Sequence, residues 1–118
     1  MESFVLSKLP PSVNESRRIN PAGAKQLSRW TTASGWEMRT QPCKPLTDGP
    51  FAVRVLVHPK RTKCDLDNVL KGCIDLLHKM HFTDDDKHMV ALHAGFDSSI
   101  DGAVQVMYWL EEKARDEL

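Results

Sequence analysis

The sequence lacks a hydrophobic run long enough to cross a membrane, and it contains no low-complexity tract and no internal repeat. Its longest apolar segment, "FAVRVLV" at 51–57, is interrupted by Arg54, whereas a membrane span needs about 20 apolar residues. Residues 1–11 have no basic region followed by a long apolar one, so we expect no signal peptide and no membrane partner. The 118 residues suffice for one hydrophobic core, and we expect residues 1–118 to form a single domain.

Cysteine is scarce as well. The chain has three cysteines, Cys43, Cys64 and Cys73, and no C-x-x-C pair. An odd number of cysteines without an expected export signal indicates free thiols in a reducing compartment. We therefore expect a cytoplasmic protein.

Net charge is also absent, because sixteen basic residues balance sixteen acidic ones. The charge is nevertheless divided along the chain: residues 1–63 hold eleven Lys and Arg against four Asp and Glu, and residues 64–118 hold five against twelve. A basic surface beside an acidic pocket suits a polyanion whose reaction requires a divalent cation. Charge alone favours the simpler interpretation, in which a small fold merely brings its two poles together.

Hydrophobic periodicity predicts a small mixed fold. The segment 51–57 is β-branched and almost wholly apolar, so we expect a central strand covered on both faces. The segment "SSIDG" at 98–102 predicts a hairpin turn between the last two strands. The element order β-α-β-α-β-β is typical of an α/β (α+β) domain with a helix-covered mixed sheet. The expected strands are 3–9, 51–57, 88–97 and 103–111, and the expected helices are 25–40 and 67–80.

The second helix is the more strongly amphipathic of the two, with an apolar stripe at a spacing of about 3.6 residues. This stripe is expected to face the core. Its members are Val69, Leu70, Cys73, Ile74, Leu77 and Met80.

Two groups of aspartates flank this helix. Asp65 and Asp67 lie where a strand has ended and the helix begins, and Asp84, Asp85 and Asp86 lie in the turn before the next strand. If the strands on either side of the helix are neighbours, the acidic turn can return near the first pair. Clustered carboxylates repel one another unless a cation neutralises them, and Mg²⁺ prefers such hard oxygen ligands. The pattern therefore predicts a Mg²⁺ site.

Each part of this pattern also has a simpler interpretation. An Asp at a helix N-terminus is the expected cap, which is the simpler role for Asp65 or Asp67, and Asp-rich turns are common on protein surfaces. Lys71 lies four residues after Asp67, which suits either an ion pair worth a few tenths of a kcal/mol or a cation that stabilises charge on a phosphate. The two acidic groups together favour the metal site, because three basic residues directly precede the first pair: Lys60, Arg61 and Lys63.

Histidine and tryptophan offer weaker alternatives. A zinc site needs three or four ligands, and the available side chains are His78, His81, His88, His93 and Cys73. No H-E-x-x-H motif supports such a site. The three tryptophans, Trp30, Trp36 and Trp109, are able to stack on bases, but in a chain of this size we expect them in the core.

The segment "CDLDNVLKGCIDLLHKMHFTDDDKHMVAL" resembles the signature of the RusA family of Holliday-junction resolvases. In that family a D-L-D-N-x-x-K segment opens a helix, a further Asp follows on the helix, and a D-D pair precedes the next strand. The segment "LPPSVN" is similar to the family's N-terminal element and places Asn14, so the likeness covers nearly the whole chain. The matching residues are Asp65, Asp67, Asn68, Lys71, Asp75, Asp85 and Asp86.

The resemblance implies a homodimeric endonuclease that nicks four-way DNA junctions symmetrically with Mg²⁺, or with Mn²⁺ in its place, and without a small-molecule cofactor. It implies the metal ligands Asp65, Asp67 and Asp86, with Asp85 as the alternative third carboxylate, and an essential Lys71. The residues expected to contact DNA are Asn14, Arg17, Arg18, Lys60, Arg61, Lys63 and Asn68.

Two other functions stay open at this point. One is a module that binds DNA junctions without cutting them. The other is a different D-x-D metal enzyme, a nuclease or nucleotidyltransferase, that acts on branched or duplex DNA.

Overall fold

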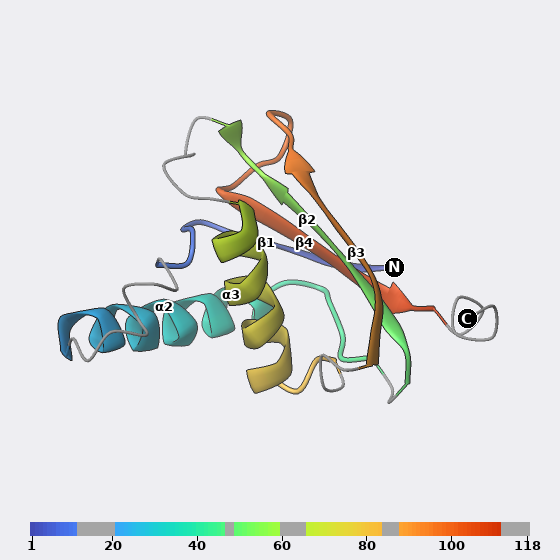
Figure 1. Cartoon of the computed structure of the whole chain (residues 1–118), viewed down its shortest axis with the longest axis horizontal. Helices are drawn as coiled ribbons and strands as arrows, with labels where there is room; N and C mark the ends of the chain where they lie inside the picture. Colours follow the sequence, from blue (N-terminus) through green and yellow to red (C-terminus); the bar gives the residue numbers. More distant parts are fainter. Residues whose placement is uncertain (12–20, 47–48, 60–65, 84–87, 112–118) are drawn as a thin grey trace.

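The fold contains the six elements in the expected order, with helices on one side of a four-stranded sheet (Figure 1). The computed structural model describes residues 1–11, 21–46, 49–59, 66–83 and 88–111, with the backbone alone for residues 21–24. No helix in these ranges combines the length and the apolar character that crossing a membrane requires. The elements are β1 (Glu2–Leu6), α2 (Pro21–Arg39), β2 (Phe51–Val57), α3 (Leu66–Lys79), β3 (Met89–Phe96) and β4 (Val104–Leu110).

The strand order in the sheet is β1-β4-β2-β3, which makes the expected hairpin between the last two strands wrong. β4 pairs antiparallel with both β1 and β2, whereas β3 pairs with β2 in parallel. The connection from β3 to β4 therefore passes the end of β2. It is fixed there because the Asp97 N–H donates to the Val57 carbonyl and the His58 N–H donates to the Ala103 carbonyl, each at 3.0 Å.

The hydrophobic core lies between the helices and one face of the sheet. Val53, Val55 and Val57 point into it from β2 and are fully buried. On the opposite face of β2, Ala52 is buried, but Arg54 is exposed and Leu56 is half-buried. The expectation that this strand is covered on both faces was therefore wrong for the described residues, because both helices pack on the same face (Figure 1).

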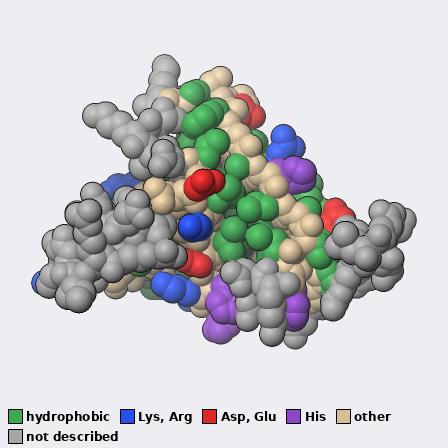
Figure 2. All heavy atoms as spheres, viewed as in Figure 1, with side chains coloured by type: hydrophobic (Ala, Val, Ile, Leu, Met, Phe, Trp, Pro, Cys, Tyr) green, Lys and Arg blue, Asp and Glu red, His purple; other side chains and the backbone are tan. Residues whose placement is uncertain are grey.

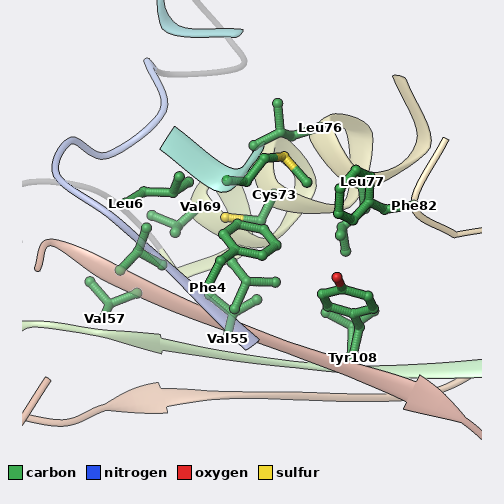
Figure 3. Close-up of a cluster of buried hydrophobic side chains, with 14 of the residues drawn as sticks. Phe4, Leu6, Val55, Val57, Val69, Cys73, Leu76, Leu77, Phe82 and Tyr108 are labelled. Carbon is green, nitrogen blue, oxygen red and sulfur yellow. The ribbon is translucent and has the colours of Figure 1, made fainter. Parts of the chain in front are cut away.

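Aromatic side chains join the layers of this core. Tyr108 of β4 packs against Phe4 of β1 and Phe82, which follows α3, with ring centroids 6.0 and 6.2 Å apart. The Tyr108 hydroxyl donates to the Lys44 carbonyl at 2.8 Å, which satisfies its only polar atom. Figure 3 shows Phe4 and Tyr108 between the sheet and the apolar side chains of α3, with Phe82 beside Leu77.

The buried face of α3 is rotated relative to the expected stripe. Val69, Cys73 and Leu77 are buried as predicted, and Leu76 is buried with them. Leu70 and Ile74, which the stripe assigned to the core, are only half-buried. They lie on the side of α3 opposite Gly72, which faces Pro10 just after β1. Because β1 and β3 form the two opposite edges of the sheet, this side of α3 is the one toward β3.

β3 consequently carries exposed apolar side chains on the helix-bearing face. Leu92 and Phe96 pair with Val53 and Val57 of β2, so the four side chains share one face of the sheet. Their exposed fractions are 40% and 53%, whereas the two valines are buried. A helix that covered β3 as well as β2 would have buried all four.

The two edges of the sheet differ in their protection. At the β1 edge, Gln41 pairs with Val5 as a neighbouring strand would: the Val5 N–H donates to Oε1 at 2.8 Å, and Nε2 donates to the Val5 carbonyl at 2.7 Å. β3 pairs with β2 on one side, and within the described ranges no strand pairs with its other side. An unpaired strand edge is a common site of association with another chain.

The tryptophans are not all in the core. Trp30 is buried, and its Nε1–H donates to the Lys8 carbonyl at 3.0 Å. Trp109 is half-buried on β4. Trp36 is 68% exposed on α2, so the expectation that it is a core residue was wrong.

Two helical glycines give a matched test of packing. A Cβ at Gly72 would lie 2.6 Å from Cβ and 2.7 Å from Cγ of Pro10, whose ring is rigid. A Cβ at Gly35 would meet the flexible end of Met80 at 2.9 Å. We expect Gly72→Ala to lower the free energy of unfolding by about 1–3 kcal/mol through overpacking. Gly35→Ala should be neutral or stabilising, because alanine gains up to about 1 kcal/mol in helix propensity.

Urea unfolding of the two variants and the wild type measures this difference. Equal effects of the two substitutions would contradict the contact between Pro10 and α3.

The buried thiol of Cys73 predicts a loss of stability at high pH. Burial raises the pKa of this thiol from 9.0 to about 12. Above pH 9 the unfolded chain releases the proton and the folded chain keeps it, so the stability falls as the pH rises from about 9 toward 12. We expect a loss of about 1 kcal/mol between pH 8 and pH 10 from this group.

The measurement is urea unfolding at both pH values for the wild type and for Cys73→Ala, which lacks the thiol but keeps every other titrating group. The variant should lose less stability than the wild type over this interval. An equal loss would show that other groups cause the pH dependence.

Candidate active site

Asp67 lies in the first turn of α3, directly after the basic segment that follows β2. Its side chain is exposed, and it makes no hydrogen bond or ion pair with the described part of the chain. The positive end of the helix dipole stabilises a carboxylate at this position. Asp67 therefore presents its two carboxylate oxygens to solvent, and no described contact shows it capping the helix.

Lys71 lies one helical turn further along the same face of α3. It is exposed, and it forms no ion pair with Asp67 or with any other described residue. The i,i+4 ion pair that the spacing allows is thus not made within the described ranges, and the ammonium group is available to an external anion. Acidic and basic side chains alternate along this exposed face of α3 (Figure 2).

Asn68 is half-buried beside Asp67. The other predicted site residues lie outside the described residues, so their positions relative to Asp67 stay predictions. They are Asn14, Arg17, Arg18, Lys60, Arg61, Lys63, Asp65, Asp85 and Asp86.

The topology limits how the two acidic groups of the sequence meet. β2 and β3 are neighbours, which was the condition for the two acidic groups to meet, but the two strands run parallel. α3 therefore returns from the end of β2 to the beginning of β3, and its 14 residues span about 21 Å. Thr83 and His88, which border the acidic turn, follow the C-terminal end of α3, whereas Asp67 lies at its N-terminal end (Figure 1).

Asp97 is a further carboxylate, directly after β3 and at the end of the sheet where α3 begins, but it has a structural partner. Its Oδ1 accepts the Ser99 N–H at 2.8 Å and the Ser99 hydroxyl at 2.6 Å. These hydrogen bonds lower the pKa of Asp97. It is thus a turn residue that holds the connection between β3 and β4.

The zinc alternative is wrong for the residues that were considered for it. Cys73 is fully buried in the hydrophobic core. His78, His81 and His93 are exposed. In the part of the chain that the structure describes, no three His, Cys, Asp or Glu side chains are arranged to hold a metal ion.

An apolar surface beside the candidate site was not predicted from the sequence. Leu70 and Ile74 of α3 with Leu92 and Phe96 of β3 are half-buried or exposed, and hydrophobic atoms gather between these elements (Figure 2). The signal in the sequence was the regular alternation of Leu92, Ala94 and Phe96 along β3. Alternation gives the face but not whether a helix covers it, so the exposure could not be predicted.

Comparison with known proteins agrees with the resemblance at the level of the whole chain. The model of the family described as endodeoxyribonuclease RusA matches residues 11–108. A curated relative, the crossover junction endodeoxyribonuclease RusA of Aquifex aeolicus (strain VF5), is 34% identical over 95 residues, which cover 75% of this chain and 74% of that protein. The chain therefore belongs to the RusA family of endodeoxyribonucleases.

Proposed function

We propose that this endodeoxyribonuclease is a Mg²⁺-dependent, homodimeric enzyme of the cytoplasm that resolves four-way DNA junctions by symmetric hydrolysis, with residues 1–118 as a single domain. Family membership gives the class of reaction. The observation that carries the proposal to particular residues is the pair Asp67 and Lys71, both exposed and unpaired among the described residues on one face of α3.

The chemistry of the proposed donor set fits Mg²⁺. Asp65, Asp67 and Asp86, or Asp85 in place of the last, supply only carboxylate oxygens, which are the ligands that Mg²⁺ and Mn²⁺ prefer. A bound ion would activate a water for attack and would neutralise charge on the phosphate. Lys71 would stabilise the negative charge that develops on the leaving oxygen.

We further propose that each site is shared between two subunits. The residues that border the acidic turn lie at the opposite end of α3 from Asp67 in one chain. Asp86 is two residues from His88, so its Cα stays within about 8 Å of the His88 Cα, whereas α3 is about 21 Å long. A second subunit running in the opposite direction would bring its own acidic turn beside Asp67.

The apolar surface between α3 and β3 supports such a contact. Leu92 and Phe96 are exposed there, the outer edge of β3 has no described partner, and Leu70 and Ile74 are half-buried beside them. A two-fold axis across this surface would place two copies of α3 antiparallel, so that the N-terminal end of each lies next to the C-terminal end of the other. The same axis would match the near two-fold symmetry of a four-way junction.

The basic residues before α3 complete the proposal. Lys60, Arg61 and Lys63 lie between β2 and Asp65 in the sequence, and Arg17 and Arg18 follow Asn14. Contacts from these residues and Asn68 to phosphates near the cleaved bond would make binding depend steeply on the salt concentration.

Cleavage of a synthetic four-way junction, compared with a linear duplex of matched sequence, tests the activity. With Mg²⁺ the wild type should make paired nicks near the crossover, and it should make none in EDTA. Asp67→Asn and Lys71→Ala should each lower the cleavage rate by about 100-fold or more. Asp101→Asn, which removes an exposed carboxylate from the connection between β3 and β4, is the control and should cut normally.

Each deviation from this result has a distinct meaning. Junction binding without cleavage would indicate a binding module, and equal cutting of the duplex would indicate a nuclease without junction specificity. Normal activity of Asp67→Asn would remove Asp67 from the site.

Mixed dimers test whether the site is shared. Asp67→Asn and Asp86→Asn are each expected to be inactive alone. If one site combines Asp67 of one subunit with Asp86 of the other, the mixed dimer keeps one intact site. A random mixture should then nick junctions at about a quarter of the wild-type rate, with single nicks instead of paired ones.

A mixture of Asp67→Asn with Asp65→Asn is the control. Both changes affect the same end of α3, so the mixed dimer has no intact site whether the site is shared or lies within one subunit. Absence of nicking in the first mixture would place all three aspartates in one subunit.

A further inference from the structure

One face of α2 presents a row of polar and aromatic side chains that the core does not use. The row consists of Lys25, Arg29, Thr32, Trp36 and Arg39, all of them exposed. Intervals of four, three, four and three residues place them on one side of a helix. From Lys25 to Arg39 the row is about 21 Å long.

Packing does not account for this row, which we call the α2 stripe. α2 contacts the rest of the fold through a different side, where Trp30, Ser34 and Met38 are buried. Trp36 is 68% exposed. Its indole is therefore available for stacking on an external partner, and exposed cations of α2 flank it in the row.

The charge of the α2 stripe is of one sign. The side chains of Lys25, Arg29 and Arg39 make no ion pair or hydrogen bond with any described residue. The only acidic residue of α2 is Glu37, which lies on another side of the helix. Its carboxylate is occupied by Ser7, whose N–H and hydroxyl donate to Oε1 at 3.2 and 2.9 Å. No carboxylate of α2 therefore opposes a bound anion on the stripe.

The position of α2 leaves the stripe accessible in the proposed dimer. α2 extends away from the sheet on the side opposite β3, as Figure 1 shows. A second subunit on the apolar surface between α3 and β3 would therefore lie away from α2. A dimer would carry one stripe on each outer flank.

We propose that the α2 stripe binds the arms of branched DNA, with Lys25, Arg29 and Arg39 on backbone phosphates and Trp36 stacked on a base that is unstacked when binding opens the branch point. The inference rests on the proposed function, since it assumes a branched DNA substrate. Three unpaired cations along a helix match a phosphate backbone in charge. An exposed indole among them offers a stacking surface that fully paired duplex does not use, because its bases are already stacked.

Binding in EDTA separates the two contributions without cleavage. Fluorescence anisotropy would compare a labelled four-way junction with a linear duplex over a series of salt concentrations. Replacing Lys25, Arg29 and Arg39 together with Ala should weaken binding to both DNAs. It should also reduce the slope of log K against log salt by about 2.7 for one engaged stripe and about twice that for two.

Trp36→Ala should weaken junction binding by about 5- to 100-fold and leave duplex binding unchanged. Trp36→Phe keeps an aromatic ring and should restore most of the junction affinity. A variant that removes exposed charges away from α2, Lys44→Ala with Arg54→Ala, is the control. It should keep the wild-type slope to within about one unit.

The outcomes distinguish this inference from the proposed function. If the wild type binds and cuts junctions but the stripe variants keep its affinity and salt slope, or the control changes as much as they do, the α2 stripe is not a DNA-binding surface. If the wild type does not prefer junctions, the proposed function fails first. Should the triple variant unfold, Arg29→Gln and Arg39→Gln singly should each reduce the slope by about 0.9, and an unchanged slope in both would overturn the inference.

Discussion

The parallel pairing of β2 with β3 is the constraint on which the rest of this structure depends. Parallel neighbours need a crossover connection, and here the crossover is α3. The helix runs antiparallel to β2 and β3, so its N-terminal end and the beginning of β3 lie at opposite ends of the strands. This arrangement places Asp67 at one end of the strands and the residues that border the acidic turn at the other end. The proposed metal site needs carboxylates from both ends of α3. Antiparallel pairing of two subunits would bring them together.

The same crossover explains the unequal covering of the sheet. α3 packs its buried face on the valines of β2 and leaves Leu92 and Phe96 of β3 exposed. The β1 edge is closed by the Gln41 amide, whereas β3 has no described partner on its outer side. One side of the molecule thus carries both the uncovered apolar surface and the open strand edge, and the other side carries α2 with its exposed cations and Trp36. The two sides suit different partners: a protein surface on the first and a polyanion on the second.

Sequence patterns predicted the element order because each element has its own periodicity, and the strand 51–57 and the helix from 66 to 79 are strongly patterned. They did not predict that β4 inserts between β1 and β2, because strand order depends on pairing between distant segments and "SSIDG" looks locally like a turn. The rotation of α3 and the exposure of Trp36 were missed for a related reason, since periodicity identifies a face but not its neighbour. At the candidate site, Asp67 and Lys71 are exposed, and their roles, taken from their spacing and from the resemblance, stay predictions. The remaining carboxylates and the basic residues before α3 lie outside the described residues.

The contact between Gly72 and Pro10 has a consequence for the N-terminal half of the chain. Gly72 is the residue after Lys71, and a single added methyl group there would collide with the Pro10 ring. The segment that leads to Asn14, Arg17 and Arg18 thus packs against α3 through Pro10, one position from the catalytic lysine that we propose. Because the Pro10 ring is rigid and Gly72 has no side chain, the start of that segment is held next to Lys71. The segment after Pro10 can therefore differ in length or composition among homologues and still begin at the same position.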